Sequence, residues 1–518
     1  MRVSFRVDAS QTIGSGHVMR CRSLARELRR QNDEVQFICK NLPGNLIEYL
    51  REDSFKVAIL EESDTYLREN SSLEYRPAVL SISEKSDASH SIDIVREFKP
   101  DWLVVDHYSL GVVWENYLRK TGVKICVIDD LARKHNCDLL IDQNYYGNYP
   151  EERYIGKLQN NCSIFLGPRY ALIDKNYTHI RRNLNKRDGH VSKILVFFGG
   201  VDKKKFTMQA IKALNHYTLS DIDVDIVIGN ANLHRDEIFE YAKKFPRYKV
   251  YENLPDLAAL MHKNDLMLGA GGSTTWERCC LGLPAIVVAV SKNQQQFSEL
   301  LFNTEIQFRV FDDSENNLDS LNELDWISSI QCIRKAPERM KLCSIRSMKL
   351  VDGLGVNRVT AHFKISKTNL KVRPAVNADE LLLFDWANDP LVRKNAFSKS
   401  PIDYESHRTW FLKILSDQNV LILIGEDEFD LPIGQIRFNC DRDEAKIDIS
   451  LDSAFLGQGL GKQLLKLGLS KLRQKMFVKR VIAEVFPYNT ASSKLFLSMG
   501  FKQFYNNDGD YLIFSLSL

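Results

Sequence analysis

Three glycine-rich stretches carry the residues of this sequence that could do chemistry. The first, "GSGHVMR" at 14–20, places His17 directly after Gly14 and Gly16 and follows the apolar run "VSFRV". Glycine lets the backbone approach a ligand closely, and a helix N-terminus offers unpaired N–H groups with a partial positive charge. The pattern predicts a strand, a ligand-binding loop and a helix that begins near His17.

Two interpretations of His17 remain open from the residues alone. A positive helix end disfavours the imidazolium, so the ring would be neutral near pH 7 and able to act as a general base. A histidine at a helix start can equally be a capping or packing residue.

The second stretch, "GAGGSTTWERCC" at 269–280, has the composition of a diphosphate-binding loop. Backbone N–H groups and hydroxyls of Gly272, Ser273 and Thr274 suit a diphosphate at a helix start. Glu277, one turn further on, could accept hydrogen bonds from two ribose hydroxyls. The alternative is a helix that packs on a sheet, with Ser273 or Thr274 as its N-cap.

The third stretch, "FLGQGLGKQLLKLGLSKL" at 455–472, joins a tight glycine turn to an amphipathic helix. A pyrophosphate at the helix start would meet the backbone N–H groups of Gln458, Gly459, Leu460, Gly461 and Lys462. A glycine-rich turn with a helix cap is the alternative.

Apolar runs that alternate with amphipathic stretches predict the elements that position the first two loops. Runs such as "EVQFIC", "DWLVVD" and "KICVID" are typical of buried parallel strands. Between "VSFRV" and "EVQFIC", apolar residues recur at helical spacing, and the other face carries Arg20, Arg22, Arg26 and Arg29. The alternation is interrupted by a polar, charged stretch at 175–192 and resumes with "KILVFFGG". We therefore expect an α/β chain with two Rossmann-like domains, over 1–178 and 179–364.

A different sequence pattern follows a predicted linker at 365–370. Strands at short intervals, such as "LPIGQIRFN" and "AKIDISL", surround the third glycine loop. They predict a mixed α/β domain over 371–518, a common domain size.

Composition limits the possible partners. The 518 residues carry a net charge of +3, with 44% hydrophobic and 26% charged residues, so we expect neither nucleic-acid nor membrane partners. The ten cysteines form no C-x-x-C pair and no Cys/His spacing typical of zinc, and no other metal cluster is visible. The charged N-terminus is unlike a signal peptide, and "LGLPAIVVAV" is too short to span a bilayer. These features predict a soluble cytoplasmic protein.

Residues 1 to about 360 resemble a known family. The stretches "RVDASQTIGSGHVMRCRSLA", "VIDDLARKHNCDLLIDQN", "FLGPRYALI" and "GAGGSTTWERCCLGLPAIVV" are similar to the PseG family. These are UDP-2,4-diacetamido-2,4,6-trideoxy-β-L-altropyranose hydrolases of pseudaminic-acid synthesis, with the GT-B arrangement of nucleotide-sugar enzymes. The resemblance implies that His17 activates water at the anomeric carbon, without a metal. It also implies that the loop 271–277 grips UDP, and that the sugar lies near Asp8, Asp106 and Tyr170.

Residues 371 to about 516 resemble GNAT acetyltransferases. "AEVFPYNTASSKLFLSMGFK" is similar to their closing segment, and "WANDPLVRKNAFSKSPIDYESHRTWF" resembles the PseH-like branch that acetylates nucleotide-linked amino sugars and protein N-termini. The resemblance implies acetyl-CoA as co-substrate, bound by the glycine loop together with Ile449, Leu451 and Asn489.

Two positions depart from the GNAT pattern. Leu456 stands where an Arg or Gln usually opens the loop, and Phe496 stands where a tyrosine often protonates the leaving thiolate. Phenylalanine donates no proton, so the role would pass to water or to another residue; Tyr488 and Glu484 are candidates by proximity in the sequence.

Together the two resemblances predict a bifunctional enzyme with small-molecule UDP-sugar substrates. The C-terminal domain would acetylate the 4-amino group of a UDP-4-amino-4,6-dideoxy sugar, and the N-terminal domains would then cleave UDP from the product. The alternatives are a GT-B glycosyltransferase fused to a protein or sugar N-acetyltransferase, and a hydrolase with a non-catalytic acetyl-CoA-binding module.

Overall fold

The computed structural model divides the chain into two compact units, Met1–Thr360 and Ala361–Leu518. It describes residues 1–60, 77–147, 150–184, 187–229, 232–252, 254–290, 292–310, 321–364, 369–505 and 510–518, without the side chains of 77–83 and 292–293. Most of the predicted linker at 365–370 lies outside the described residues.

The first sheet of unit 1 consists of seven parallel strands in the order β3-β2-β1-β4-β5-β6-β7. The strands are β1 (Arg2–Val7), β2 (Glu34–Lys40), β3 (Lys56–Leu60), β4 (Trp102–Asp106), β5 (Lys124–Ile128), β6 (Leu139–Asp142) and β7 (Ser163–Leu166). Helices cover both faces, so the central strands are mostly apolar, although β1 also buries Ser4 and Arg6. The carboxyl ends of β1, β4, β5 and β6 therefore lie side by side at one edge of the sheet.

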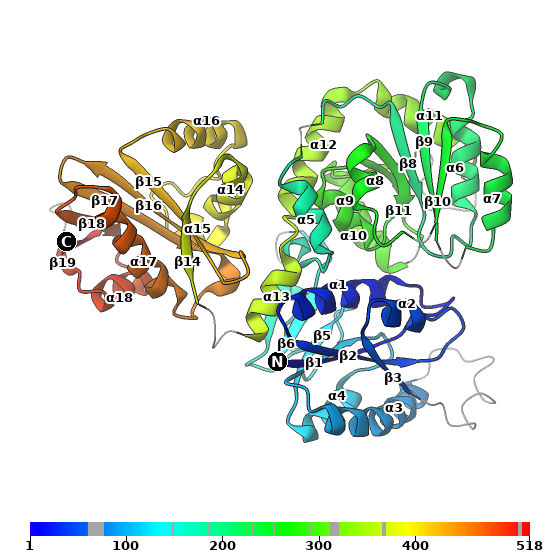
Figure 1. Cartoon of the computed structure of the whole chain (residues 1–518), viewed down its shortest axis with the longest axis horizontal. Helices are drawn as coiled ribbons and strands as arrows, with labels where there is room; N and C mark the ends of the chain where they lie inside the picture. The colour runs from blue at the N-terminus through cyan, green and yellow to red at the C-terminus, as the bar shows by residue number, and fades with distance from the viewer. Residues whose placement is uncertain are drawn as a thin grey trace. The chain divides into compact units, whose positions relative to one another are not determined.

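Four helices flank this sheet. They are α1 (Gly16–Arg30), α2 (Ile47–Glu52), α3 (Pro77–Phe98) and α4 (Val112–Leu118); Figure 1 shows α1 and α2 on one face and α3 and α4 on the other. The apolar stripe of α1 is buried, as its spacing predicts. Its arginine face is not wholly exposed, however: Arg20 and Arg22 are buried because they bond to Asp106 and Asp53.

The second sheet of unit 1 has six parallel strands in the order β10-β9-β8-β11-β12-β13. They are β8 (Lys193–Phe197), β9 (Asp223–Ile228), β10 (Tyr248–Glu252), β11 (Leu266–Ala270), β12 (Ala285–Val288) and β13 (Phe308–Arg309). Residues of α6 (Phe206–Leu214), α7 (Arg235–Ala242) and α11 (Glu323–Arg334) share one core cluster with this sheet. Another core cluster contains residues of α5 (Lys175–Arg181), α8 (Ala258–Lys263), α9 (Thr274–Cys280) and α10 (Lys292–Asn303). Helices α12 (Pro337–Leu350) and α13 (Gly355–Phe363) follow.

Unit 2 contains a seven-stranded mixed sheet in the order β14-β15-β16-β17-β18-β20-β19. Its strands are β14 (Lys371–Pro374), β15 (Val420–Glu426), β16 (Pro432–Asp441), β17 (Glu444–Leu451), β18 (Arg480–Val485), β19 (Lys502–Tyr505) and β20 (Leu512–Ser517). Its helices are α14 (Glu380–Asn388), α15 (Pro390–Lys394), α16 (Tyr404–Leu415), α17 (Leu460–Lys475) and α18 (Thr490–Ser498). Among the described strands of unit 2, only β17 and β18 pair in parallel.

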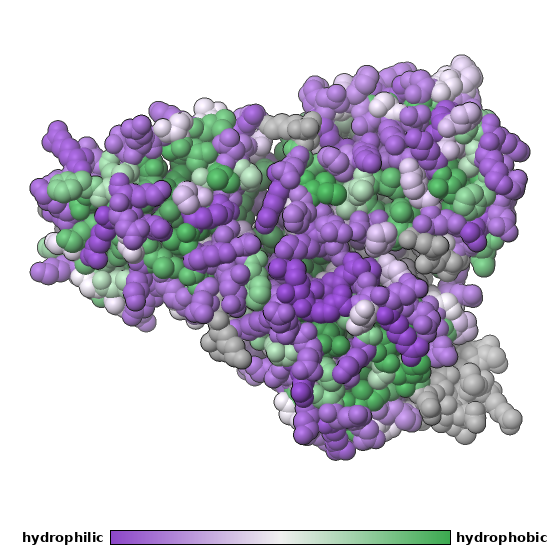
Figure 2. Space-filling model, in the orientation of Figure 1, coloured by the Kyte–Doolittle hydropathy of each residue, from purple (hydrophilic) through white to green (hydrophobic). Residues whose placement is uncertain are grey.

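The predicted fold class is confirmed: two parallel α/β sheets precede a mixed α/β domain. The sequence patterns did not identify β20 or the short strands β7, β13, β14 and β19. The surface seen in Figure 2 is mostly hydrophilic, with small hydrophobic groups between. Within the described ranges, no helix combines the length and apolarity needed to cross a membrane.

Candidate functional site

His17 lies in the first turn of α1, and a carboxylate at the end of β4 holds its ring. The Nδ1 atom is 2.5 Å from Oδ1 of Asp106, 89 positions away in the sequence. Arg20 donates to both oxygens of the same carboxylate, at 2.5 and 2.6 Å. The His17 side chain is 11% exposed, whereas that of Asp106 is fully buried. The imidazole is therefore the part of this cluster that can meet a ligand.

Asp106 determines which nitrogen of His17 can accept a proton. An ionised carboxylate only accepts hydrogen bonds, so Nδ1 of the neutral ring carries its hydrogen toward Oδ1. The Nε2 atom is then unprotonated and can act as a base. The His17 ring bonds to Asp106 and so is not available to cap α1, whereas a packing role is not tested by this contact.

Asp106 is ionised despite its burial. Burial by itself would raise the pKa of its carboxyl, but the charge of Arg20 and the contacts with His17 hold that pKa well below its usual range. The negative charge orients His17 and would stabilise the imidazolium that forms when the ring takes a proton. Asp106 lies behind the ring, and its contact with a sugar stays a prediction.

Asp8 makes a second carboxylate–histidine pair beside the first. Arg6 donates to its two oxygens at 2.7 and 2.9 Å, and the Lys40 N–H donates at 2.8 Å. His107 accepts the Ser109 N–H on Nδ1 at 3.1 Å, so its Nε2 carries the hydrogen and lies 3.2 Å from Asp8. Asp8 is 1% exposed and anchors the residue that follows Asp106. Its predicted contact with the sugar is not tested by this geometry.

Tyr170 is placed by packing rather than by the His17 cluster. It ends the 3-10 helix η3 (Pro168–Tyr170), and its ring stacks on Phe165 with centroids 4.4 Å apart. Its carbonyl carbon would lie 2.5 Å from a Cβ added to Gly355, so α13 begins directly against it. A role for Tyr170 near the sugar remains a prediction.

The first and second glycine loops face each other within unit 1. A Cβ added to Gly16 would lie 3.7 Å from Oγ of Ser273, and one added to Gly200 would lie 3.2 Å from Oγ of Ser15. Gly14 adopts φ +85°, which disfavours other residue types. The Ser273 side chain makes no N-cap hydrogen bond to α9. Its hydroxyl therefore points toward the first loop without the capping role of the alternative interpretation.

Glu277 is a half-buried carboxylate in the first turn of α9, the helix that also begins with Thr274. Burial raises its pKa to about 7, partly opposed by a hydrogen bond from Tyr177 and reinforced by the charges of Asp256 and Asp174. A carboxyl group in this state gains from hydroxyl donors, since hydrogen bonds to the ionised form favour it. The environment fits a pair of ribose hydroxyls.

Gln294 is a candidate binding residue that the sequence reading missed. Its side-chain oxygen accepts the Val290 N–H at 3.1 Å, and the amide lies within 4 Å of Cβ positions built on Gly271 and Gly272. The amide therefore lies against the backbone of the second glycine loop. The run "NQQQF" at 293–297 was the available signal.

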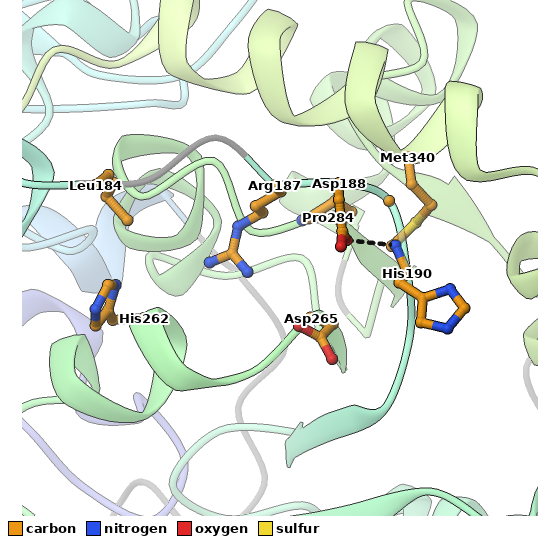
Figure 3. Close-up of a pocket in the computed structure, with 9 residues that line it drawn as sticks. Leu184, Arg187, Asp188, His190, His262, Asp265, Pro284 and Met340 are labelled. Carbon is orange, nitrogen blue, oxygen red and sulfur yellow. Dashed lines mark hydrogen bonds between the residues drawn. The ribbon is translucent and has the colours of Figure 1, made fainter.

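A cavity of about 300 Å³ lies at the other end of the second sheet (Figure 3). Most of its lining residues precede β8, β11 or β12, and Met340 comes from α12, whereas the glycine loop follows β11. Arg187, at its centre in Figure 3, donates to the carbonyls of Asn264 and Met261 at the C-terminus of α8. This guanidinium caps a helix, and the cavity contains none of the predicted site residues.

The third glycine loop leads from β17 into α17. Gly457 and Gly459 have φ of +76° and +75°, and no atom lies within 4 Å of a Cβ built on either. This left-handed turn leaves open space where the loop turns into a sixteen-residue helix. Leu460 is buried, whereas Lys462 and Leu456 are exposed. The geometry fits the predicted pyrophosphate cradle, and acetyl-CoA contacts there stay a prediction.

The strands beside this loop separate toward their ends. β17 pairs with β18 only through Glu444–Lys446, although it continues to Leu451. Ile449 and Leu451 lie in the separated part and pack against the core. Asn489 caps α18 by accepting the Ser492 N–H at 3.2 Å. Two of the predicted acetyl-CoA residues, Ile449 and Leu451, thus lie where β17 no longer pairs with β18.

Position 496 is a phenylalanine, and the structure does not identify another residue as the proton donor for the leaving thiolate. Phe496 is 3% exposed and packs against Phe501 and Phe514. The Tyr488 hydroxyl donates to the Lys394 carbonyl, and Glu484 pairs with Lys446. Both candidates already have partners, so neither is singled out as the proton donor.

Comparison with known proteins supports both halves of the sequence interpretation. Residues 193–341 match the glycosyltransferase family 28 C-terminal domain, and residues 369–502 match the acetyltransferase (GNAT) domain. The UDP-2,4-diacetamido-2,4,6-trideoxy-beta-L-altropyranose hydrolase of Campylobacter jejuni is 26% identical over 297 residues, which cover 57% of this chain and 94% of that protein. The chain joins a PseG-like region to a GNAT domain.

Two further relatives match a larger share of this chain. The uncharacterized protein MJ1062 of Methanocaldococcus jannaschii is 24% identical over 520 residues and covers 97% of both chains. The spore coat polysaccharide biosynthesis protein SpsG of Bacillus subtilis is 27% identical over 378 residues, covering 70% of this chain and 97% of that protein.

Proposed function

We propose that the chain is a bifunctional enzyme of pseudaminic-acid synthesis. Its GNAT domain acetylates the 4-amino group of a UDP-4-amino-4,6-dideoxy sugar, and unit 1 hydrolyses the resulting UDP-2,4-diacetamido-2,4,6-trideoxy sugar. The observation that carries the hydrolytic half is the His17–Asp106 pair, set at the sheet edge with its loop facing Ser273.

In the proposed hydrolysis, Nε2 of His17 removes a proton from water while the water oxygen attacks the anomeric carbon. The bond between that carbon and the bridging oxygen breaks, and UDP leaves with its original oxygen. Asp106 stabilises the imidazolium formed in this step. Gly272, Ser273 and Thr274 hold the diphosphate, and Glu277 holds the ribose. Asp8 and Tyr170 shape the sugar side of the site.

In the proposed acetylation, the neutral amine attacks the thioester carbonyl of acetyl-CoA. The acetyl group moves to nitrogen, the amine loses a proton and the thiolate leaves. Residues 458–462 hold the pyrophosphate, while Ile449, Leu451 and Asn489 flank the thioester arm. Alignment of the two substrates supplies most of the rate enhancement.

The hydrolytic half is tested by His17→Ala in the full-length chain. Loss of a general base should reduce hydrolysis by about 10²-fold or more, while UDP affinity stays nearly unchanged. His90→Ala is the matched control, because His90 is an exposed histidine on α3 of the same unit. Near-normal turnover by His17→Ala would contradict the assignment.

Isotope labelling tests which bond breaks. In ¹⁸O-labelled water the label should appear on the free sugar and not on UDP, because water attacks carbon. Label on UDP would show attack at phosphorus and would contradict the mechanism.

The order of the two reactions follows from the cost of burying a charge. A free 4-amine would enter the pocket as a cation in place of a neutral amide, and an unpaired buried cation is costly. UDP release from the unacetylated sugar should therefore stay slow until acetyl-CoA is added. Equal release with and without acetyl-CoA would contradict this order.

A second candidate is a glycosyltransferase, favoured by the family 28 match over residues 193–341. A transferase needs a sugar acceptor for turnover, whereas a hydrolase releases UDP in buffer alone. Measuring UDP release with and without acceptors distinguishes the two. Acetyl-CoA consumption with UDP-amino sugars, compared with peptides, separately identifies the acceptor of the GNAT domain.

A further inference from the structure

Asp130 is a buried carboxylate at the edge of the first sheet that carries His17 and Asp106. It follows the end of β5, directly beside the end of β4 in the sheet order. Ligands of open parallel sheets bind outside the carboxyl ends of the strands. Asp130 therefore lies at the edge where a substrate of His17 would lie.

One oxygen of Asp130 is held firmly. Oδ2 accepts the Tyr108 hydroxyl at 3.1 Å and the Asn144 side-chain amide at 3.3 Å. The backbone carbonyl of Asp130 is also fixed, by the Tyr146 hydroxyl at 3.1 Å and by Arg153 at 3.0 Å. The first two bonds orient the carboxylate, and the other two fix the backbone that carries it.

The other oxygen has no partner. Oδ1 of Asp130 is inaccessible at the atomic level and accepts no hydrogen bond, in a residue that is only 9% exposed. An unsatisfied buried acceptor is costly, so a ligand that donates a hydrogen bond to it would gain affinity. The Tyr108 ring that bonds to Oδ2 also contacts the His17 ring edge-on, with centroids 4.7 Å apart. Tyr108 therefore contacts both Asp130, which carries the unpartnered Oδ1, and His17, the proposed base.

We propose that Asp130 orients the sugar by accepting, on Oδ1, an N–H or O–H hydrogen bond from a ring substituent. Small movements of Tyr108, which is 36% exposed, would open this oxygen to the ligand. The acceptor selects for a donor at one sugar position and sets the anomeric carbon against His17. The inference rests on the proposed hydrolase function and adds a specificity-determining residue to it.

The test is Asp130→Asn in the full-length chain. Asn144 donates toward the Oδ2 position, so that position must keep the amide oxygen, and the new NH₂ group replaces the orphan acceptor. With the diacetamido UDP-sugar we expect kcat/KM to fall at least tenfold. Asp101→Asn, an exposed carboxylate at the amino end of β4, is the control and should behave as the parent. Thermal midpoints of both variants identify any loss of folding.

A binding measurement separates this inference from the proposed reaction. In a His17→Ala background, calorimetry gives the affinity for the UDP-sugar relative to UDP, with no turnover. Asp130→Asn should reduce that ratio at least tenfold and leave UDP affinity unchanged. Analogues without the 2- or the 4-acetamido group should include one that binds equally well with Asp and with Asn at position 130.

Each outcome decides between the two claims. An unchanged affinity ratio in Asp130→Asn overturns the role of Asp130, even if His17→Ala abolishes hydrolysis. A UDP-sugar that binds no tighter than UDP overturns it as well. Normal turnover in His17→Ala, with a reduced ratio in Asp130→Asn, contradicts the proposed mechanism but supports the sugar contact. If Asp130→Asn fails to fold, Tyr108→Phe tests the same orientation: it must lower the ratio severalfold, and an unchanged ratio overturns the proposal.

Discussion

Glu277→Gln should make the ligand-free protein more stable at alkaline pH and weaken its binding of UDP. Burial raises the pKa of this carboxyl from 4.5 to about 7. The folded protein therefore disfavours the ionised form relative to the unfolded chain. A group of this kind contributes its full stability below pH 4.5 and loses that contribution as the pH rises through 7.

The size of the effect follows from the two pKa values. A rise from 4.5 to about 7 corresponds to roughly 3 kcal/mol once both states are ionised. At pH 5 the loss is below about 1 kcal/mol, because the folded state is still protonated. A glutamine of the same shape carries no charge at either pH. The variant should therefore gain roughly 2–3 kcal/mol over the parent at pH 8, and much less at pH 5.

Thermal unfolding of the two full-length proteins at pH 5 and pH 8, with and without UDP, measures this prediction. Without UDP, the variant should melt higher at pH 8 by a few degrees, and the difference should shrink at pH 5. With UDP the order should reverse, because only the parent offers an ionised acceptor to the ribose hydroxyls. Titration of the UDP phosphate affects both proteins equally and cancels in the comparison.

Two results would refute this reasoning. Equal melting differences at pH 5 and pH 8 would show that Glu277 has no raised pKa. An unchanged UDP dissociation constant, with only turnover reduced, would place Glu277 in the chemical step instead of the ribose site.

Three other expectations are open to simple tests. Asp106→Asn should reduce hydrolysis by about 10²-fold or more without changing UDP affinity, since an amide NH₂ facing His17 imposes the wrong tautomer; normal turnover would remove Asp106 from the mechanism. EDTA should leave hydrolysis unchanged, and activity that is lost on chelation and restored by magnesium or manganese would overturn the metal-free mechanism. Although burial opposes its charge, the nearby carboxylate of Asp129 and the hydrogen bond to Glu115 raise the pKa of His135 to about 9. Stability present below pH 6.5 should therefore be lost as the pH rises through 9, and His135→Gln should flatten that part of a melting-temperature profile.

The elements of both units were predictable because their signals are local. Buried parallel strands must be apolar on both faces, so runs such as "DWLVVD" are visible in a short window. Gly14 and Gly459 adopt positive φ values, as expected of glycines in tight turns, so these turns could be predicted from the residue type alone. Short edge strands such as β7 and β13 carry too few residues for such a pattern.

The arginine face of α1 shows where local reasoning fails. Helical spacing separates it from the apolar stripe, and charged side chains usually face water. Arg20 and Arg22 are buried instead, because Asp106 and Asp53 arrive from distant parts of the chain to pair with them. No window around α1 contains either partner.

The sequence by itself determined the parallel sheets, the three glycine turns and the place of His17 at a helix start. These features follow from residue type and periodicity within about twenty positions. Only the tertiary structure decided that Asp106 orients His17, that His107 contacts Asp8, and that Asp130 keeps an unpartnered oxygen. A carboxylate acquires its role from the donors around it, and adjacent parallel strands bring those donors together from tens of positions away.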